Sequence, residues 1–160
     1  IPVFLVVLYL DSAGARWWAL GIFVVACLTD FADGYIARHY NQITNFGKFM
    51  DPLADKMLVM AAMCYFVEYG QMPGWCLAIV LLREFAVSGM RLVAVEQGRV
   101  IAAAWSGKVK TASTMVCLCL MLVFQSNLLN VVCIAVIVAT TVYSGIEYFA
   151  KNLDVFKEAD

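Results

Sequence analysis

The sequence predicts an all-α integral membrane protein with six transmembrane helices, the first of them truncated. Two observations lead to this prediction. The chain has 160 residues, of which 64% are hydrophobic and 14% are charged, whereas about a quarter of the residues in a soluble globular domain are charged. Residues 111–146 contain no charged residue, and a helix of that length would exceed the roughly 30 Å of a bilayer's hydrocarbon core. That stretch must therefore turn back once and supply two spans.

Short polar, glycine and proline signals separate the apolar segments of what we interpret as a single domain over residues 1–160. Gln125, Ser126 and Asn127 form a polar cluster in the middle of the uncharged stretch and indicate a tight hairpin. Gly70 and Pro73 mark another turn. The predicted spans are 1–10, which is truncated, then 17–41, 48–69, 74–96, 105–125 and 128–150, and the charged tail 151–160 is expected to continue the last helix.

The distribution of lysine and arginine predicts the orientation of these spans. If the spans alternate in direction, almost every basic residue falls on one side, which the positive-inside rule makes cytoplasmic. The net charge of −1 gives no indication of a nucleic-acid partner. The basic residues on the predicted cytoplasmic side are Arg38, Lys48, Lys56, Arg91, Arg99, Lys108, Lys110, Lys151 and Lys157, with Arg83 deeper in the same half and Arg16 opposite.

Four aspartates interrupt the apolar pattern near the cytoplasmic ends of the second and third spans: Asp30, Asp33, Asp51 and Asp55. Each pair is spaced by three or four residues, which places both members on one face of a helix. A short connection makes the two helices antiparallel neighbours that can bring the carboxylates together. Clustered carboxylates in a membrane need compensating charge, and hard oxygen ligands favour divalent cations. The simpler alternative is that the aspartates pair with lysine and arginine at a helix end.

Small residues lie among these aspartates, at Gly34, Ala37 and Gly47. In membrane proteins such residues commonly allow two helices to pack closely. Here they could equally leave room for a flat base or a diphosphate to lie against the backbone, and the residues alone leave both interpretations open. The only histidine, His39, is expected to be an interfacial residue without a catalytic role.

Residues 30–55 read D-F-A-D-G-Y-I-A-R-H-Y-N-Q-I-T-N-F-G-K-F-M-D-P-L-A-D. This segment resembles the signature of the CDP-alcohol phosphotransferase family, D-x2-D-G-x2-A-R-x8-G-x3-D-x3-D, at all eight specified positions. The resemblance implies six transmembrane helices around a polar cavity open to the cytoplasm, and a homodimer. Further segments are similar to the bacterial phosphatidylglycerophosphate synthase branch of the family: 44–48, 51–56, 83–91, 100–103 and 107–111.

The resemblance also implies a set of site residues. Asp30, Asp33, Asp51 and Asp55 would be metal ligands for two Mg²⁺ or Mn²⁺ ions, and Asp55 would also be the general base. The expected reaction is a metal-assisted direct displacement, in which the phosphatidyl group of CDP-diacylglycerol passes to sn-glycerol 3-phosphate with release of CMP. The implied CDP-diacylglycerol-binding residues are Asp30, Asp33, Gly34, Ala37, Arg38 and Gly47.

The acceptor of this reaction carries a phosphate dianion and therefore needs fixed positive charge. We expect Arg83, Arg91, Lys108 and Lys110 to supply it. Placing the charge of an arginine in apolar surroundings costs free energy, which indicates a binding role, and arginine is suited to phosphate. Glu84 is seven residues from Arg91, on nearly the same helix face, and could orient it. The alternatives are that these are boundary charges set by topology and that Arg83 pairs with Glu84 or Glu147.

Two other functions compete with this interpretation. Within the enzyme class, a related synthase could make cardiolipin, phosphatidylinositol phosphate or phosphatidylserine. Neutral or zwitterionic acceptors would not need the four basic residues. In a different class, a divalent-cation transporter could use the same acidic cluster. A conduction path should have polar groups at both ends, however, and only Glu68, Gln71 and Gln125 populate the other end.

Overall fold

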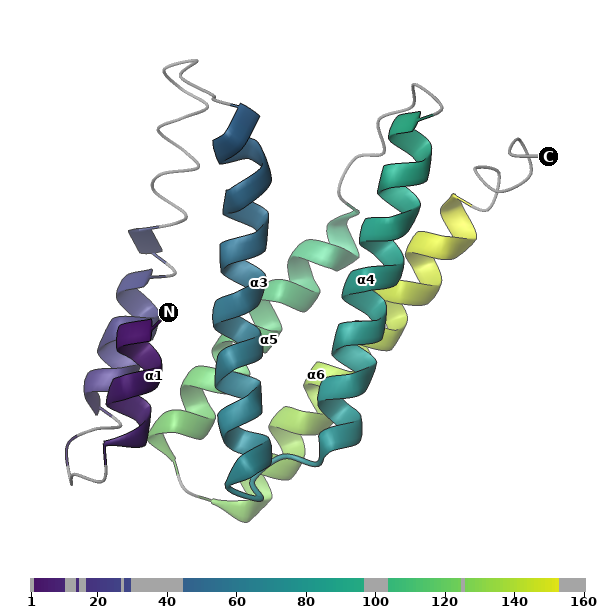
Figure 1. Ribbon diagram of the computed structural model, residues 1–160. Helices are drawn as coiled ribbons and strands as arrows, with labels where there is room; N and C mark the ends of the chain where they lie inside the picture. The colour runs from purple at the N-terminus through teal and green to yellow at the C-terminus, as the bar shows by residue number, and fades with distance from the viewer. Residues whose placement is uncertain are drawn as a thin grey trace.

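The computed structural model describes residues 2–10, 14, 17–26, 28–29, 45–96, 104–124 and 126–152, with the backbone alone for residues 45–55 and 96. The helices within these ranges lie side by side in a bundle (Figure 1). They are α1 (Pro2–Tyr9), an apolar helix over Trp17–Ala26, α3 (Asn45–Glu68), α4 (Gly74–Glu96), α5 (Trp105–Val123) and α6 (Asn127–Lys151). The predicted all-α architecture is therefore confirmed. The ends of α1, α3, α4, α5 and α6 lie within three residues of the predicted ones, whereas the predicted end of the second span at residue 41 lies outside the described residues.

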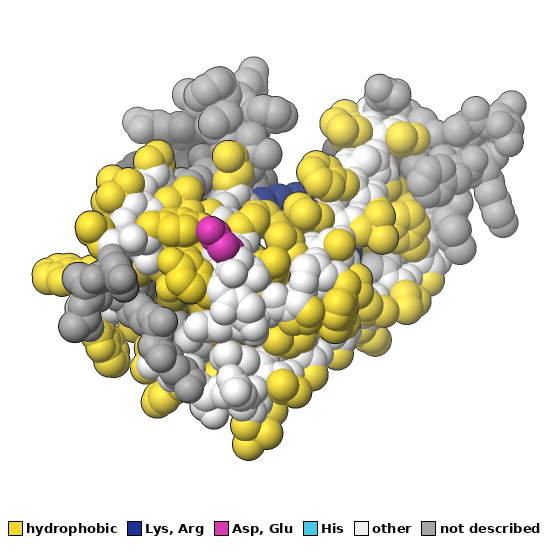
Figure 2. Space-filling model, turned by 60° about the horizontal axis from the view of Figure 1, so that its bottom comes forward, with side chains coloured by type: hydrophobic (Ala, Val, Ile, Leu, Met, Phe, Trp, Pro, Cys, Tyr) yellow, Lys and Arg dark blue, Asp and Glu magenta, His cyan; other side chains and the backbone are white. Residues whose placement is uncertain are grey.

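Two helices in the described part of the chain are long and apolar enough to cross a membrane, α5 and α6. Only 33% and 28% of their most apolar windows are buried inside the bundle, the reverse of a core helix in a soluble protein. In Figure 2, which brings the lower end of Figure 1 forward, hydrophobic side chains are spread widely over the described part of the face shown. Large exposed hydrophobic residues on these helices include Val109, Val116, Leu128, Val131, Tyr143 and Ile146.

The buried core joins side chains from every helix described. Phe4 of α1 packs against Phe23, with ring centroids 5.6 Å apart. Met63 of α3 and Leu118 of α5 are fully buried in the same cluster. The packing places the first residue of α3, the last of α4, the first of α5 and the last of α6 toward one end of the bundle (Figure 1). This is the end to which the sequence assigned most of the basic residues.

The predicted hairpin between the last two spans is confirmed. Helix α5 ends where the Phe124 N–H donates to the Leu120 carbonyl, at 2.8 Å, and α6 begins where the Asn130 N–H donates to the Ser126 carbonyl, at 2.9 Å. The last helix ends at Lys151. Of the charged tail that was predicted to continue this helix, the structure describes Lys151, which is helical, and Asn152, which is the C-cap; residues 153–160 lie outside the described residues.

Gly70 follows the last turn of α3 and adopts a left-handed backbone conformation, with φ of +67°. The Gly70 N–H donates to the Val67 carbonyl and the Gln71 N–H donates to the Phe66 carbonyl, at 3.1 and 2.8 Å. This pair of bonds is a Schellman motif, in which glycine avoids the strain that a Cβ would cause. The motif turns the chain into α4 and so fixes α3 and α4 as antiparallel neighbours.

Replacing Gly70 with Ala is expected to lower the free energy of unfolding by about 1 kcal/mol, because alanine is strained at positive φ. Thermal unfolding in detergent measures this. The matched control is Gly89→Ala in the middle of α4, where an added Cβ meets no described atom within 4 Å, and where alanine should be neutral or stabilising. Equal unfolding temperatures for the two variants would contradict the role given to Gly70.

Candidate functional site

The acidic motif is described only in part. Asp30, Asp33, Gly34, Ala37 and Arg38 lie outside the described residues. Gly47, Asp51 and Asp55 lie on α3, which the structure describes there by its backbone. The helix is continuous across this region, so Asp51 and Asp55 are one turn apart and share a face, as their spacing predicted. No group of three or more potential metal ligands occurs among the residues whose side chains are described, and the four-aspartate metal site stays a prediction.

One residue beyond Asp55, a cluster of charged side chains joins α3, α4 and α5. The carboxylate of Glu84, on α4, is the centre of this cluster. Its Oε1 accepts hydrogen bonds from Lys110 Nζ at 2.6 Å and from Arg83 Nη1 at 3.0 Å, and its Oε2 lies 3.2 Å from Lys56 Nζ. We call Lys56, Arg83, Glu84 and Lys110 the Glu84 cluster.

The Glu84 cluster is largely withdrawn from solvent and carries excess positive charge. The exposed fractions of its side chains are 5% for Lys110, 11% for Glu84, 12% for Arg83 and 39% for Lys56. Buried charges are tolerated when they are paired and hydrogen-bonded. Among the described side chains, three cations face one carboxylate and leave a net charge of +2, which favours binding of an anion.

Small and hydroxyl-bearing residues on the neighbouring helices accommodate the cluster. Lys56 Nζ donates to Ser88 Oγ at 3.0 Å, and Arg83 Nη2 donates to Ser144 Oγ, on α6, at 2.5 Å. A Cβ added to Gly107 would lie 3.3 Å from Arg83 Nη2, and one added to Gly145 would lie 3.4 Å from Arg83 Cγ. The arginine therefore occupies space that these two glycines, on α5 and α6, leave open.

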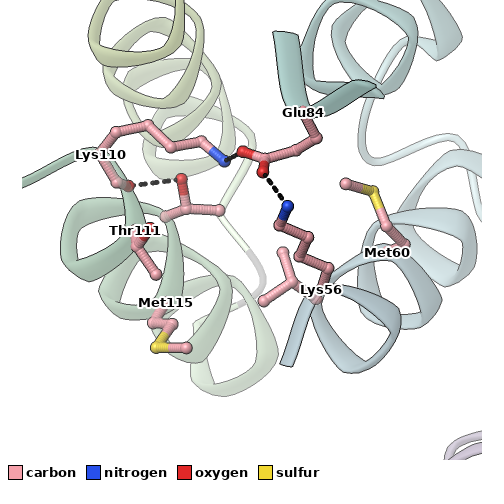
Figure 3. A pocket seen from close by; sticks show the side chains of 8 residues that line it. Lys56, Met60, Glu84, Lys110, Thr111 and Met115 are labelled. Carbon is pink, nitrogen blue, oxygen red and sulfur yellow. Dashed lines mark hydrogen bonds and ion pairs between the residues drawn. The ribbon is translucent and has the colours of Figure 1, made fainter. Parts of the chain in front are cut away.

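A pocket of about 150 Å³ opens beside the Glu84 carboxylate. In Figure 3, Lys56 and Lys110 extend toward Glu84 from different helices, and each joins it by a dashed line. The base of Lys110 is fixed because its carbonyl accepts a hydrogen bond from Thr114 Oγ1 at 2.8 Å. The pocket is lined by Lys56, Val59, Met60, Glu84, Lys110, Thr111, Thr114 and Met115. Its two ammonium groups suit a small anionic ligand, whereas the hydroxyl groups of Thr111 and Thr114 donate to helix carbonyls.

The four basic residues predicted to bind the acceptor do not all meet. Arg83 and Lys110 meet at Glu84. Arg91 Nε instead donates to the Tyr148 hydroxyl at 3.1 Å, and its guanidinium lies 5.6 Å from the centre of that ring. Lys108 is exposed, with Nζ 5.9 Å from the centre of the Trp105 ring.

The sequence interpretation paired Glu84 with the wrong cation. It expected the carboxylate to orient Arg91, but Glu84 contacts Lys56, Arg83 and Lys110. The ion pair between Arg83 and Glu84, which was the alternative considered for Arg83, is present. Lys56 was named only among the basic residues on the predicted cytoplasmic side. Its position directly after Asp55 is a signal that could have placed it beside the site.

The comparison with protein families decides the classification. The family model for CDP-alcohol phosphatidyltransferase matches residues 1–143. The chain belongs to the CDP-alcohol phosphatidyltransferase family. Members of this family are membrane-associated and are generally dependent on divalent metal ions. The resemblance of residues 30–55 to the family signature is thereby confirmed.

Bacterial members of the CDP-alcohol phosphatidyltransferase family are similar over most of this chain. A protein of Bacillus subtilis (strain 168) is 42% identical over 145 residues, which are 87% of this chain and 75% of that protein. It is named CDP-diacylglycerol–glycerol-3-phosphate 3-phosphatidyltransferase, as is a protein of Escherichia coli (strain K12), 41% identical over 74% of this chain and 67% of its own length. A probable phosphatidylglycerophosphate synthase of Mycobacterium tuberculosis (strain ATCC 25618 / H37Rv) is 38% identical over 96% of this chain and 76% of its own.

Proposed function

We propose that this chain transfers the phosphatidyl group of CDP-diacylglycerol to sn-glycerol 3-phosphate, giving phosphatidylglycerophosphate and CMP. The names of its bacterial relatives support this activity. The observation that carries the choice of a phosphorylated acceptor is the Glu84 cluster, whose described side chains have a net charge of +2. Three of its members, Lys56, Glu84 and Lys110, line a pocket that begins one residue beyond Asp55. A phosphomonoester dianion neutralises such a cluster, whereas a neutral alcohol leaves its charge uncompensated.

The proposed setting is the cytoplasmic membrane of a bacterium, with six spans around a polar cavity open to the cytoplasm. Helices α3 and α4 contain 24 and 23 residues, and about 20 suffice to span a bilayer. They carry charged residues within their apolar sequences, and the described side chains Lys56, Arg83 and Glu84 face one another rather than lipid. The enzyme is proposed to act as a homodimer, as the family resemblance implies.

The donor is proposed to bind at the aspartate motif. Asp30, Asp33, Asp51 and Asp55 would hold two Mg²⁺ or Mn²⁺ ions, for which carboxylate oxygens are suitable ligands. When bound, the ions supply positive charge to the diphosphate and to the departing CMP. The continuous backbone of α3 supports this assignment, because it places Asp51 and Asp55 one turn apart. The other donor-binding residues are Gly34, Ala37, Arg38 and Gly47, with Arg38 directed to the diphosphate.

The reaction is proposed to be a single displacement. Asp55 accepts the proton of the C1 hydroxyl of glycerol 3-phosphate while that oxygen forms a bond to the phosphorus of the phosphatidyl group. The bond from this phosphorus to the bridging oxygen of the diphosphate breaks, and CMP leaves with the electron pair. Alignment of the two substrates lowers the barrier, because the displacement becomes effectively unimolecular. No covalent enzyme intermediate is required.

The acceptor's phosphate is proposed to bind near Arg83 and Lys110, with Arg91 and Lys108 adding charge from more exposed positions. Arg91 is held by Tyr148 and Lys108 lies near Trp105, so each is restrained by an aromatic ring. Restrained cations lose less conformational entropy when they bind an anion.

Replacing Arg91 or Lys108 with Ala is expected to raise the apparent KM for glycerol 3-phosphate roughly tenfold, because a charge-assisted contact is lost. The turnover number at saturating acceptor should change little. CMP release measured against acceptor concentration tests this. An unchanged dependence on glycerol 3-phosphate would remove the residue concerned from the acceptor site.

The proposed function is tested with the purified chain in detergent, supplied with CDP-diacylglycerol, Mg²⁺ and glycerol 3-phosphate. Release of CMP that requires all three is the expected result. Serine, inositol phosphate and phosphatidylglycerol are supplied as alternative acceptors, and preference for one of these would identify a different synthase. Binding of divalent ions without any CMP release would favour the transporter.

A further inference from the structure

Among the described side chains, Glu84 is the one carboxylate that contacts the three cations of the Glu84 cluster, Lys56, Arg83 and Lys110. Both of its oxygens are engaged, Oε1 by Lys110 and Arg83, and Oε2 by Lys56. The three cations come from α3, α4 and α5, so a single carboxylate fixes the relative positions of side chains on three helices. Arg83 is held in turn by Ser144 of α6.

The described contacts leave part of the hydrogen-bonding capacity of the two lysines unused. An ammonium group has three N–H donors. Lys110 directs one of them to Glu84. Lys56 directs one to Ser88 and forms an ion pair with Glu84 at 3.2 Å. The contacts of the described side chains thus leave N–H groups of both lysines for a ligand in the pocket that both line. A phosphomonoester presents three terminal oxygens as strong acceptors.

We propose that Glu84 is a positioning residue for acceptor binding, which holds the ammonium groups of Lys56 and Lys110 so that both contact the phosphate of glycerol 3-phosphate. This inference rests on the proposed function and deepens it in two ways. It adds Lys56 to the residues that contact the acceptor, and it gives a role to a carboxylate that would otherwise repel an anionic substrate. In this role Glu84 would contact neither the reacting phosphorus nor the donor.

The physical need for Glu84 follows from the burial of its partners. Lys110 is 5% exposed, and an ammonium group buried without a counter-charge loses its proton or moves to solvent. Without the carboxylate, the three neighbouring cations would also repel one another. Glutamine preserves the shape of the side chain but removes its charge, and its NH₂ group would meet ammonium donors. The lysines would then separate before the acceptor arrives.

Three variants test this inference: Glu84→Gln, Glu84→Asp and the control Glu147→Gln. Glu147 forms an ion pair with Lys151 and lies outside the Glu84 cluster. CMP release is measured against glycerol 3-phosphate at saturating CDP-diacylglycerol, and then against CDP-diacylglycerol at saturating acceptor. Glu84→Gln should raise the acceptor KM roughly ten- to a hundredfold, with donor KM and turnover number changed less than threefold. Glu84→Asp, which retains the charge on a shorter stem, should lie between the wild type and Glu84→Gln.

The outcomes separate this inference from the proposed function. Failure of the wild-type chain to release CMP with glycerol 3-phosphate would overturn the proposed function itself. With an active wild type, an unchanged acceptor KM in Glu84→Gln would overturn the role of Glu84. Equal increases in the KM of both substrates would indicate a merely structural role and would also overturn it. If Glu84→Gln does not fold, Glu84→Asp is the test. A raised acceptor KM in that variant would support the role of Glu84, and a wild-type acceptor KM would overturn it.

Discussion

Replacing Asp55 with Asn is expected to reduce CMP release by a factor of at least about a thousand, since general-base catalysis contributes roughly 10² to 10⁴ and a proposed metal ligand is lost as well. Asparagine has nearly the same size and can still accept a hydrogen bond, but it cannot take up the proton of the acceptor hydroxyl. The measurement is single-turnover CMP release with CDP-diacylglycerol and glycerol 3-phosphate at saturating concentrations.

The control for this variant is binding of the donor. CDP-diacylglycerol should still bind to Asp55→Asn with an affinity close to that of the wild type, because Asp30, Asp33 and Asp51 are unchanged. Loss of donor binding together with turnover would assign Asp55 to the donor site alone. Wild-type turnover would remove it from the reaction.

Replacing Lys110 with Met should raise the acceptor KM about a hundredfold, because the pocket loses a buried ammonium group that bonds at 2.6 Å to Glu84. Methionine retains most of the apolar stem, so the packing against α3 and α4 is preserved. Glu84 keeps two cationic partners, Lys56 and Arg83, and is not left as an unpaired buried charge. Folding should therefore survive the substitution.

Lys108→Met is the matched comparison, because Lys108 is on the same helix, two residues away, and is exposed near Trp105. Its effect on the acceptor KM should be about tenfold smaller, since an exposed cation is weakened by solvent screening. CMP release measured against glycerol 3-phosphate concentration gives the acceptor KM of each variant. A larger effect at Lys108 than at Lys110 would place the phosphate outside the pocket beside Glu84.

The sequence predicted the helices well because their signals are local. The uncharged stretch could not be a single span, and the polar residues in its middle lie where the structure places the turn between α5 and α6. Gly70 was recognised as a turn residue and adopts positive φ. The ends of α3 differ by up to three residues from the predicted 48–69, which is normal, because apolar periodicity does not define the terminal residues of a helix.

The partners of Glu84 could not be predicted in the same way. Its spacing from Arg91 places the two on one face, but seven residues of helix separate them by about 10 Å along the axis. A carboxylate bonds to whichever cations are nearest in space, and those include side chains from α3 and α5. Arg91 contacts Tyr148 of α6 instead. Helical spacing identifies a face but does not identify the residues that the neighbouring helices bring to it.

Gly107 and Gly145 have a consequence that reaches beyond the arginine lying against them. A Cβ at Gly107 or Gly145 would lie 3.3 or 3.4 Å from the Arg83 side chain, so Arg83 could accommodate an alanine by a small shift but not a larger side chain. A bulkier residue at either position would displace Arg83 and α4. The Glu84 carboxylate would then move away from Lys56 of α3 and Lys110 of α5. The alignment of the charged atoms around Glu84 thus depends on the small volume of the residues at these two positions.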